Sequence, residues 1–76
     1  MRNDAEELGS IIRKRRELLG LLQPDLADVA GISTRTIQLV EQGKGNPSLE
    51  TLYKLIHPLG LTFKVELKSA SENNKS

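Results

Sequence analysis

Apolar residues recur every three or four positions through most of the chain, which is the spacing of amphipathic α-helices. The first such stripe predicts a helix over residues 4–19 that ends at Gly20. Asn3 or Asp4 is suited to cap its first turn. The apolar positions of this stripe are Leu8, Ile11, Ile12 and Leu19. We expect them to face the core of the domain.

A shorter helix is predicted over residues 23–30, between two residues that favour helix boundaries. Pro24 fits the first helical turn, where its missing N–H costs nothing, and Gly31 ends the helix. The inward side of this helix is expected to consist of Leu26, Val29 and Ala30.

A third helix, predicted over residues 34–42 and closed by Gly43, has two different faces. Ile37 and Val40 lie about 60° apart on a helical wheel and define a buried side. The opposite side is polar and consists of Thr34, Arg35, Gln38 and Gln42. Because these polar positions are contiguous, they either form a solvated face or read a ligand. Ser33 or Thr34 is suited to cap this helix.

The fourth predicted helix covers residues 48–57, with Asn46 or Ser48 as its cap. Its apolar face contains Leu49, Leu52, Leu55 and Ile56, with Tyr53 at the edge. Pro58 should stop or kink the helix, because a residue before proline, here His57, avoids helical backbone angles.

From residue 61 the apolar period changes from 3.6 to two, which predicts a β-strand over residues 61–68. Its apolar face consists of Leu61, Phe63, Val65 and Leu67. No other segment has a strand pattern, so the hydrogen-bonding partner should be the same strand of a second copy, antiparallel about a twofold axis. A fifth helix, or a segment folded against its own domain, is the alternative. Residues 69–76 are small and polar and predict a disordered tail.

The chain has 76 residues, enough for one small domain, and a formal net charge of +1. A domain of this size buries only about 60% of the surface that its unfolded form exposes. The sequence has no cysteine, which excludes disulfide bonds and thiolate metal sites, and the single His57 cannot form a zinc site alone. Oligomerisation is therefore the expected reinforcement.

Several classes of protein are excluded by what the sequence lacks. It has no nucleophile–base pair, no glycine-rich phosphate loop and no metal-ligand cluster, so we expect no enzymatic activity and no cofactor. The acidic N-terminus lacks the apolar region of a signal peptide. The longest apolar run, residues 18–22, is far shorter than the roughly 20 residues of a membrane span. A cytoplasmic protein is therefore expected.

The second and third predicted helices carry the spacing of a helix-turn-helix. Ala27 is small where two helices cross closely, and Gly31 supplies the left-handed backbone of the turn. Ile37 and Val40 follow six and nine positions after that glycine and pack back onto the first helix of the pair.

Residues 8–60, and above all "LLQPDLADVAGISTRTIQLVEQGKGNPSLETLYKL", resemble the Xre or lambda-repressor-like family. The shared positions are Gln23, Leu26, Ala27, Gly31, Ile37, Glu41, Gly43, Pro47 and Ser48. The resemblance implies a mostly α, lambda-repressor-like domain of four or five helices over residues 4–60. It also implies that the third helix lies in the major groove of double-stranded DNA.

Carried over by position, the resemblance implies two kinds of DNA contact. Base edges would be read by Ser33, Thr34, Arg35 and Gln38. Phosphates would be held by Gln23, Lys44, Asn46 and Arg13. The chemistry agrees, because Arg bonds guanine and Gln bonds adenine bidentately, each worth about 1–3 kcal/mol of base discrimination. The alternative is a solvated helix face and a plain surface loop.

The resemblance also implies a partly buried ion pair between Arg16 and Glu41, which would remove Glu41 from the DNA-facing surface. Two unconnected surface charges are the alternative. This chain departs from the family pattern at three positions. Leu22 stands where Ser or Thr usually caps the second helix, and Arg15 stands where an apolar residue is common. Pro58 is unusual in the fourth helix.

A helix-turn-helix followed by a short strand, residues 9–67, is similar to the HipB-like antitoxin regulators. That similarity implies a homodimer joined by an intermolecular sheet, which binds a palindromic operator and represses its own operon. It also implies a HipA-like kinase toxin as partner, although no residue is a signature of kinase binding. The alternatives are a stand-alone Xre-type repressor without a toxin, or a protein that mainly neutralises a toxin.

Overall fold

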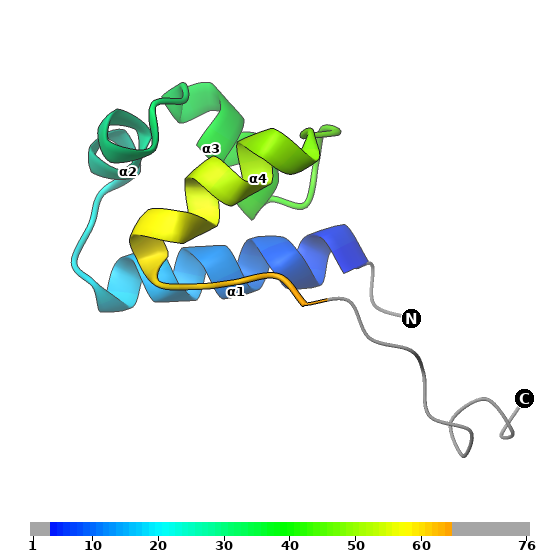
Figure 1. Ribbon diagram of the computed structural model, residues 1–76, viewed down its shortest axis with the longest axis horizontal. Coiled ribbons are helices and arrows are strands. Elements are labelled where there is room, and N and C mark those ends of the chain that lie inside the picture. The colour runs from blue at the N-terminus through cyan, green and yellow to red at the C-terminus, as the bar shows by residue number, and fades with distance from the viewer. Residues whose placement is uncertain (1–3, 65–76) are drawn as a thin grey trace, which may run out of the picture.

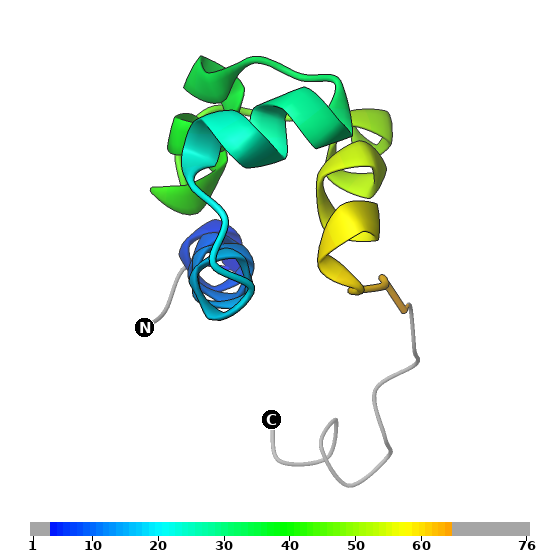
Figure 2. The same cartoon turned by 90° about the vertical axis from the view of Figure 1, so that its left-hand side faces the viewer.

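The computed structural model describes residues 4–64, and this part of the chain forms four α-helices followed by one 3₁₀ turn (Figure 1). The elements are α1 (Asp4–Leu18), α2 (Gln23–Ala30), α3 (Thr34–Glu41), α4 (Leu49–Ile56) and η1 (His57–Leu59). In a view along the axis of α1, this helix lies on one side and α4 on the other, and α2 and α3 lie across the space between them (Figure 2). No described helix has the length and apolar character needed to cross a membrane.

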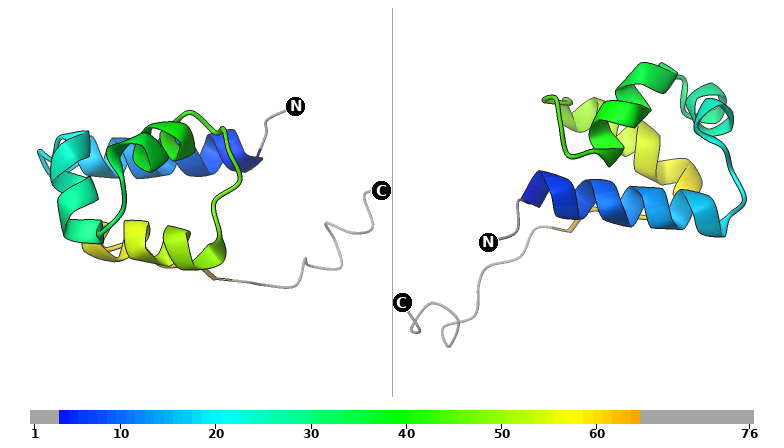
Figure 3. Two further views of the ribbon diagram at one scale, coloured as in Figure 1. Left: turned by 90° about the horizontal axis from the view of Figure 1, so that it is seen from above. Right: turned by 180° about the vertical axis from the view of Figure 1, so that it is seen from behind.

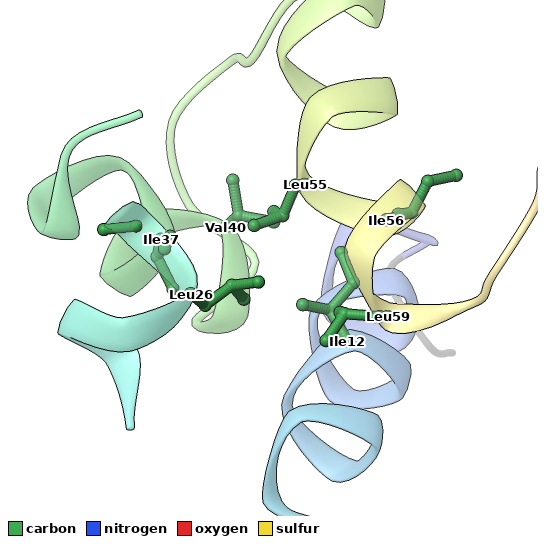
Figure 4. Close-up of a cluster of buried hydrophobic side chains, with 8 residues drawn as sticks. Ile12, Leu26, Ile37, Val40, Leu55, Ile56 and Leu59 are labelled. Carbon is green, nitrogen blue, oxygen red and sulfur yellow. The ribbon is translucent and has the colours of Figure 1, made fainter. Parts of the chain in front are cut away.

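Each element contributes one fully buried side chain to a single core (Figure 4). These side chains are Ile12, Leu26, Ile37, Leu55 and Leu59. Full burial of one Leu or Ile stabilises a fold by about 1.5–3 kcal/mol. Because the five residues come from five elements, the core holds every described element in place.

Two residues expected to face inward lie on the surface instead. Val29 is 66% exposed, because the buried side of α2 is centred between Leu26 and Ala27, about 100° around the helix from Val29. Leu49 is 61% exposed, because it occupies the first turn of α4 and the core reaches only the later turns of that helix. The predictions for both residues were wrong.

The apolar stripe of α1 is also narrower than its pattern suggested. Ile12 is fully buried and Leu8 half-buried, whereas Ile11 is 47% and Leu19 44% exposed. Leu19 lies one residue beyond the end of the helix. The core therefore uses only the centre of the predicted stripe.

The turn between α2 and α3 has the expected left-handed glycine. Gly31 has φ +72°, and its N–H donates to the carbonyl of Ala27 at 2.9 Å. Ser33 then caps α3, since its Oγ accepts from the backbone N–H of Thr36 at 3.1 Å. Two short helices are thus joined at a sharp angle by one permissive residue and one cap.

The start of α2 lacks a side-chain cap, because Leu22 occupies the N-cap position. Asp25 compensates in part, since its Oδ2 accepts from the backbone N–H of Leu22 at 2.9 Å. The helix therefore begins at Gln23, as predicted, despite the weak cap signal.

The helix α4 ends at Ile56, before Pro58, as predicted. The expectation for His57 was wrong, because it has helical angles, φ −57° and ψ −52°, and Pro58 lies inside the 3₁₀ turn that follows. Proline disfavours helical angles before it but does not forbid them. The continued turn buries Leu59, whose carbonyl accepts from Arg15 Nε at 2.7 Å. The burial of Leu59 outweighs the preference of His57, as the residue before proline, for non-helical angles.

Residues 61–64 continue without forming a strand among the described residues. The expected alternation is present, since Leu61 and Phe63 are half-buried while Thr62 and Lys64 are exposed. The rings of Phe63 and Tyr53 meet edge to face at 5.6 Å. The remainder of the predicted strand, residues 65–68, and the predicted tail, 69–76, lie outside the described residues, so the pairing strand stays a prediction.

Candidate nucleic-acid interface

The faces of α3 are divided as its sequence pattern indicated. Ile37 and Val40 are buried in the core, while Arg35 is exposed on the opposite side. Seen from above, α3 lies across the top of the molecule and is not covered by another described helix (Figure 3). The polar side of α3 is thus open to a ligand along its length.

Ser33 and Thr34 lie at the start of α3, beside a shallow hollow that Pro24 and Asp28 of α2 also line. The Ser33 hydroxyl already caps the helix and meets Thr36 Oγ1 at 2.9 Å. To read a base, the Ser33 hydroxyl would therefore have to bond the base while it still caps α3. Asp28 is an exposed acid close to these two residues, which the sequence reasoning did not consider.

A groove of about 480 Å³ lies between α1, the start of α2 and α3. It brings together three residues predicted to contact DNA, namely Arg13, Gln23 and Gln38. Gln38 thus shares a groove with two predicted phosphate contacts, whereas Arg35 does not line it. The structure divides the predicted base-reading residues between the exposed side of α3 and this groove.

At the floor of the groove, Arg16 and Glu41 form a bidentate ion pair. Arg16 Nε lies 2.6 Å from Glu41 Oε2, and Arg16 Nη2 donates to Glu41 Oε1 at 2.9 Å. Their side chains are only 9% and 4% exposed. The hydrogen bond to Glu41, opposed by burial, raises the pKa of the Arg16 guanidinium above its ordinary value.

Two further contacts tie this pair to the start of α2. Arg16 Nη1 donates to the carbonyl of Leu21 at 2.8 Å, and Gln23 Nε2 donates to Glu41 Oε1 at 3.1 Å. The buried Glu41 carboxylate therefore connects α1, α2 and α3, and its partner Arg16 also binds the connection between α1 and α2. Glu41 is also neutralised by Arg16 and withdrawn from the surface, which removes an acid from the face that DNA would approach.

The predicted phosphate contact Arg13 is exposed but already partnered. Its Nε lies 3.2 Å from Glu17 Oε2, and the two side chains are 63% and 53% exposed. An exposed pair of this kind is weak, so a phosphate could replace Glu17 as the partner. Sequence reasoning missed Glu17, although its position four residues after Arg13 is the spacing of a helical ion pair.

The backbone at the start of α2 offers less to an anion than a typical helix N-terminus. Pro24 has no N–H, and the Asp25 carboxylate already occupies the N-cap region. Binding of an anion at this point would therefore depend on the Gln23 side chain and on Arg13. The helix dipole adds to that attraction without supplying a full set of donors.

Lys44 and Asn46 lie in the loop after α3, as predicted, and line a hollow with Thr36 and Leu39. The Lys44 backbone is held in place, because its N–H donates to the carbonyl of Leu39 at 2.8 Å. Both side chains are exposed. Among the described residues, neither Lys44 nor Arg35 forms an ion pair, so both cations are available to a phosphate or a base.

The basic run of α1 does not form a patch. Arg13 pairs with Glu17, Arg15 binds the carbonyl of Leu59, and Arg16 pairs with Glu41, so the three arginines point to three different partners. Of the four basic residues at positions 13–16, Arg13 and Lys14 are exposed, whereas Arg15 is half-buried and Arg16 is buried. Within residues 4–64, no group of three or more potential ligands is arranged to hold a metal ion.

Gln42 was not among the predicted site residues, although the helical wheel placed it on the polar side of the third helix. It caps the C-terminal end of α3, is exposed, and lines the groove beside Gln38. Its position on the wheel was the signal that could have identified it.

Comparison with known proteins identifies a family model that covers most of the chain. The helix-turn-helix model HTH_3 matches residues 12–65. An uncharacterised HTH-type transcriptional regulator of Haemophilus influenzae is 42% identical over 50 residues, which is 66% of this chain and 51% of the relative. HTH-type transcriptional regulator DdrOP3 of Deinococcus deserti is 41% identical over 51 residues, which is 67% of this chain and 40% of that protein. The chain thus spans about half the length, or less, of these two relatives.

A solved structure shares the fold. The restriction-modification controller protein C.AhdI from Aeromonas hydrophila superposes with a TM-score of 0.73 at 32% sequence identity. The superposition covers 78% of this chain and 89% of that one. The prediction of a small, mostly helical domain with a helix-turn-helix is therefore confirmed.

Proposed function

The chain belongs to the helix-turn-helix family HTH_3, and from that premise we propose that it is a DNA-binding transcription regulator that inserts α3 into the major groove. One observation carries the proposal. The outer side of α3 presents Arg35, which forms no ion pair within residues 4–64, while Glu41, the only acid of that helix, is buried against Arg16. A recognition helix needs a cationic, acid-free surface because DNA is a polyanion.

Base reading is assigned to Arg35 together with Ser33, Thr34 and Gln38. Arg35 is the strongest candidate, because it is exposed and forms no ion pair among the described residues. A bidentate bond to guanine would contribute about 1–3 kcal/mol of discrimination against another base. Gln38 reaches DNA from the groove, where it lies closer to the backbone contacts.

Phosphate binding is assigned to Gln23, Lys44, Asn46 and Arg13, which flank α3 on two sides. The groove between α1 and α2 supplies one backbone contact and the loop after α3 supplies the other. Contacts on both sides of a recognition helix set its register on the duplex without reading sequence.

We further propose that the regulator is a homodimeric repressor that binds a palindromic operator. Residues 61–64 present a half-buried apolar row, and the N–H groups of Thr62 and Phe63 form no hydrogen bond in the described part of the chain. Such an edge favours pairing with the same segment of a second copy. Val65 and Leu67 continue the alternation outside the described residues.

The finer biological role rests on the HipB-like resemblance. It favours an antitoxin that represses its own operon and binds a HipA-like kinase toxin. A stand-alone Xre-type repressor without a toxin, or a protein that mainly neutralises a toxin, is the alternative. Copurification of a kinase with the chain expressed from its native operon would favour the antitoxin. A chain that purifies alone and still binds its operator would favour the stand-alone repressor.

The deciding experiment is a salt titration of binding to the DNA upstream of the protein's own gene, beside a scrambled duplex of equal length. Binding to the upstream duplex should survive physiological salt while binding to the scrambled duplex is lost. Equal weak binding to both duplexes would contradict sequence-specific regulation at this site.

A further inference from the structure

We propose that Glu41 is a positioning residue for DNA binding, because it orients the Gln23 amide toward a phosphate in the groove between α1, α2 and α3. This inference rests on the proposed function, since it names the residue that prepares one of its backbone contacts. Glu41 does not itself touch DNA in this proposal, because its side chain is only 4% exposed.

The orientation of the Gln23 amide follows from the chemistry of its partner. A carboxylate only accepts hydrogen bonds, so the Gln23 nitrogen, and not its carbonyl oxygen, must face Glu41. In the structure, Gln23 Nε2 donates to Glu41 Oε1 at 3.1 Å. This contact removes the two-fold ambiguity of an amide and leaves its second N–H for a ligand in the groove.

Glu41 is itself held too firmly to follow Gln23. Arg16 binds both of its oxygens, and Arg16 is fixed in turn by the carbonyl of Leu21. A buried, doubly bound carboxylate is a rigid reference point for a half-buried side chain beside it. Ordering the Gln23 side chain before binding avoids an entropy cost, which corresponds to about a 2- to 10-fold gain in affinity.

The same contact connects the two functional ends of the motif. Gln23 begins α2, and Glu41 is the last residue of α3. The position of the Gln23 amide, and so of its DNA phosphate contact, is thereby fixed relative to α3. This helps to hold α3 in one register on the duplex.

The first test examines the free protein. In the full chain labelled with ¹⁵N, the side-chain amide of Gln23 should show a high heteronuclear NOE, whereas the exposed Gln42 amide should show a low one. The Gln23 value should fall to that of Gln42 in Glu41→Gln. Equal NOE values for both amides in the wild-type protein would overturn the proposal, whatever DNA binding shows.

The second test is a double-mutant cycle for binding to the upstream and scrambled duplexes. Gln23→Met, which keeps the shape of the side chain but has no N–H, should weaken binding about 10-fold. Glu41→Gln should weaken it about 3- to 10-fold when Gln23 is present and less than about 2-fold in the Gln23→Met background. In the control Leu18→Ser, at an exposed residue that does not line the groove, Glu41→Gln should have the same effect as in the wild-type protein.

The sign of the effect separates positioning from simple charge. Loss of a negative charge near DNA should strengthen binding. If Glu41→Gln instead weakens DNA binding, the loss cannot come from the change in charge. If Glu41→Gln does not fold, the pair Arg16→Met with Glu41→Leu removes the carboxylate without leaving a buried charge, and the same cycle is measured on it.

Each outcome has a separate meaning. An equal effect of Glu41→Gln in both Gln23 backgrounds would overturn positioning and leave only a structural role. If the wild-type protein bound both duplexes equally, the proposed sequence-specific function would fail. The cycle would still measure positioning in that case, because a phosphate contact is common to both duplexes.

Discussion

Gly9 of α1 packs directly against the backbone of Glu41 at the end of α3. A Cβ atom built on Gly9 would lie 2.7 Å from the Glu41 carbonyl oxygen, closer than real Cβ contacts occur. The absence of a side chain at this position lets α1 and α3 approach closely beside the Arg16–Glu41 ion pair. A glycine within a helix, normally a cost, is required here by the neighbouring backbone.

We therefore expect Gly9→Ala to destabilise the protein by about 2–3 kcal/mol, because the overpacking exceeds the roughly 1 kcal/mol that alanine contributes to helix propensity. Urea unfolding followed by circular dichroism measures the change. Gly20→Ala is the matched control. It has φ +74° but no atom within 4 Å of the added Cβ, so it should cost only about 1 kcal/mol. A loss for Gly9→Ala no larger than that for Gly20→Ala would contradict the close approach of α1 and α3 as the main cost at Gly9.

The buried ion pair predicts a second result. Arg16→Met alone should destabilise the fold by about 3–5 kcal/mol, because Glu41 is left charged, buried and without its main partner. Combining it with Glu41→Leu should restore most of the lost stability, since neither charge then remains. Thermal melts of the three proteins test this. A double variant as unstable as the single one would mean that the pair contributes through its exact geometry.

Arg35 and Lys44, which form no ion pair in the described part of the chain, allow base reading and phosphate binding to be tested separately. Arg35→Ala should lose about 1–3 kcal/mol of preference at one base pair per half-site. Lys44→Ala should weaken binding to all sequences alike and reduce the slope of log K against log salt by about 0.9. Binding to a panel of single-base operator variants at several salt concentrations distinguishes them. A uniform loss for Arg35→Ala would assign that residue to a phosphate.

Ser33 is the N-cap of α3, so a test of its predicted DNA contact must separate that contact from the loss of the cap. Ser33→Ala and Ser48→Ala each remove an N-cap whose Oγ accepts a backbone N–H at 3.1 Å, so each should cost about 1 kcal/mol of stability. Ser48 caps α4 and is not one of the predicted base-reading residues. Under conditions where both variants are folded, an additional loss of base discrimination for Ser33→Ala alone would establish its DNA contact. Identical binding by the two variants would leave Ser33 as a cap only.

The proposed dimer is tested at Phe63, whose ring packs on Tyr53. Phe63→Ser should shift the protein to monomer and weaken operator binding, because a palindromic site gains its affinity from two half-sites. Leu18→Ser, at a 74% exposed apolar residue on α1, is the control and should remain dimeric. Sedimentation velocity reports the mass. A wild-type protein that is monomeric at high concentration would contradict the dimer directly.

Much of the local structure follows from the sequence alone. The helix boundaries lie within about two residues of the predicted ones, because glycines with positive φ, serine caps and the 3.6-residue period are properties of short segments. The two faces of α3 follow in the same way, since Ile37 and Val40 are separated from Arg35 by helix geometry and by nothing else.

Other features depended on how the helices lie against one another. Leu59 is buried and Val29 is exposed because the position of the core relative to α2 and η1 decides their environment, and no local pattern specifies that position. Likewise, the sequence suggested the Arg16–Glu41 pair through a family resemblance, but not that Gln23 would join it.

The sequence by itself therefore determined which segments are helical and which side chains of α3 point away from the core. Only the tertiary structure decided that Arg13, Gln23 and Gln38 share one groove and that one carboxylate joins three helices. The physical reason is the distance along the chain over which each interaction acts. Backbone preferences act over a few neighbouring residues, whereas a contact between residues 16 and 41 exists only once the crossing of α1 and α3 is set by the packing of the whole core.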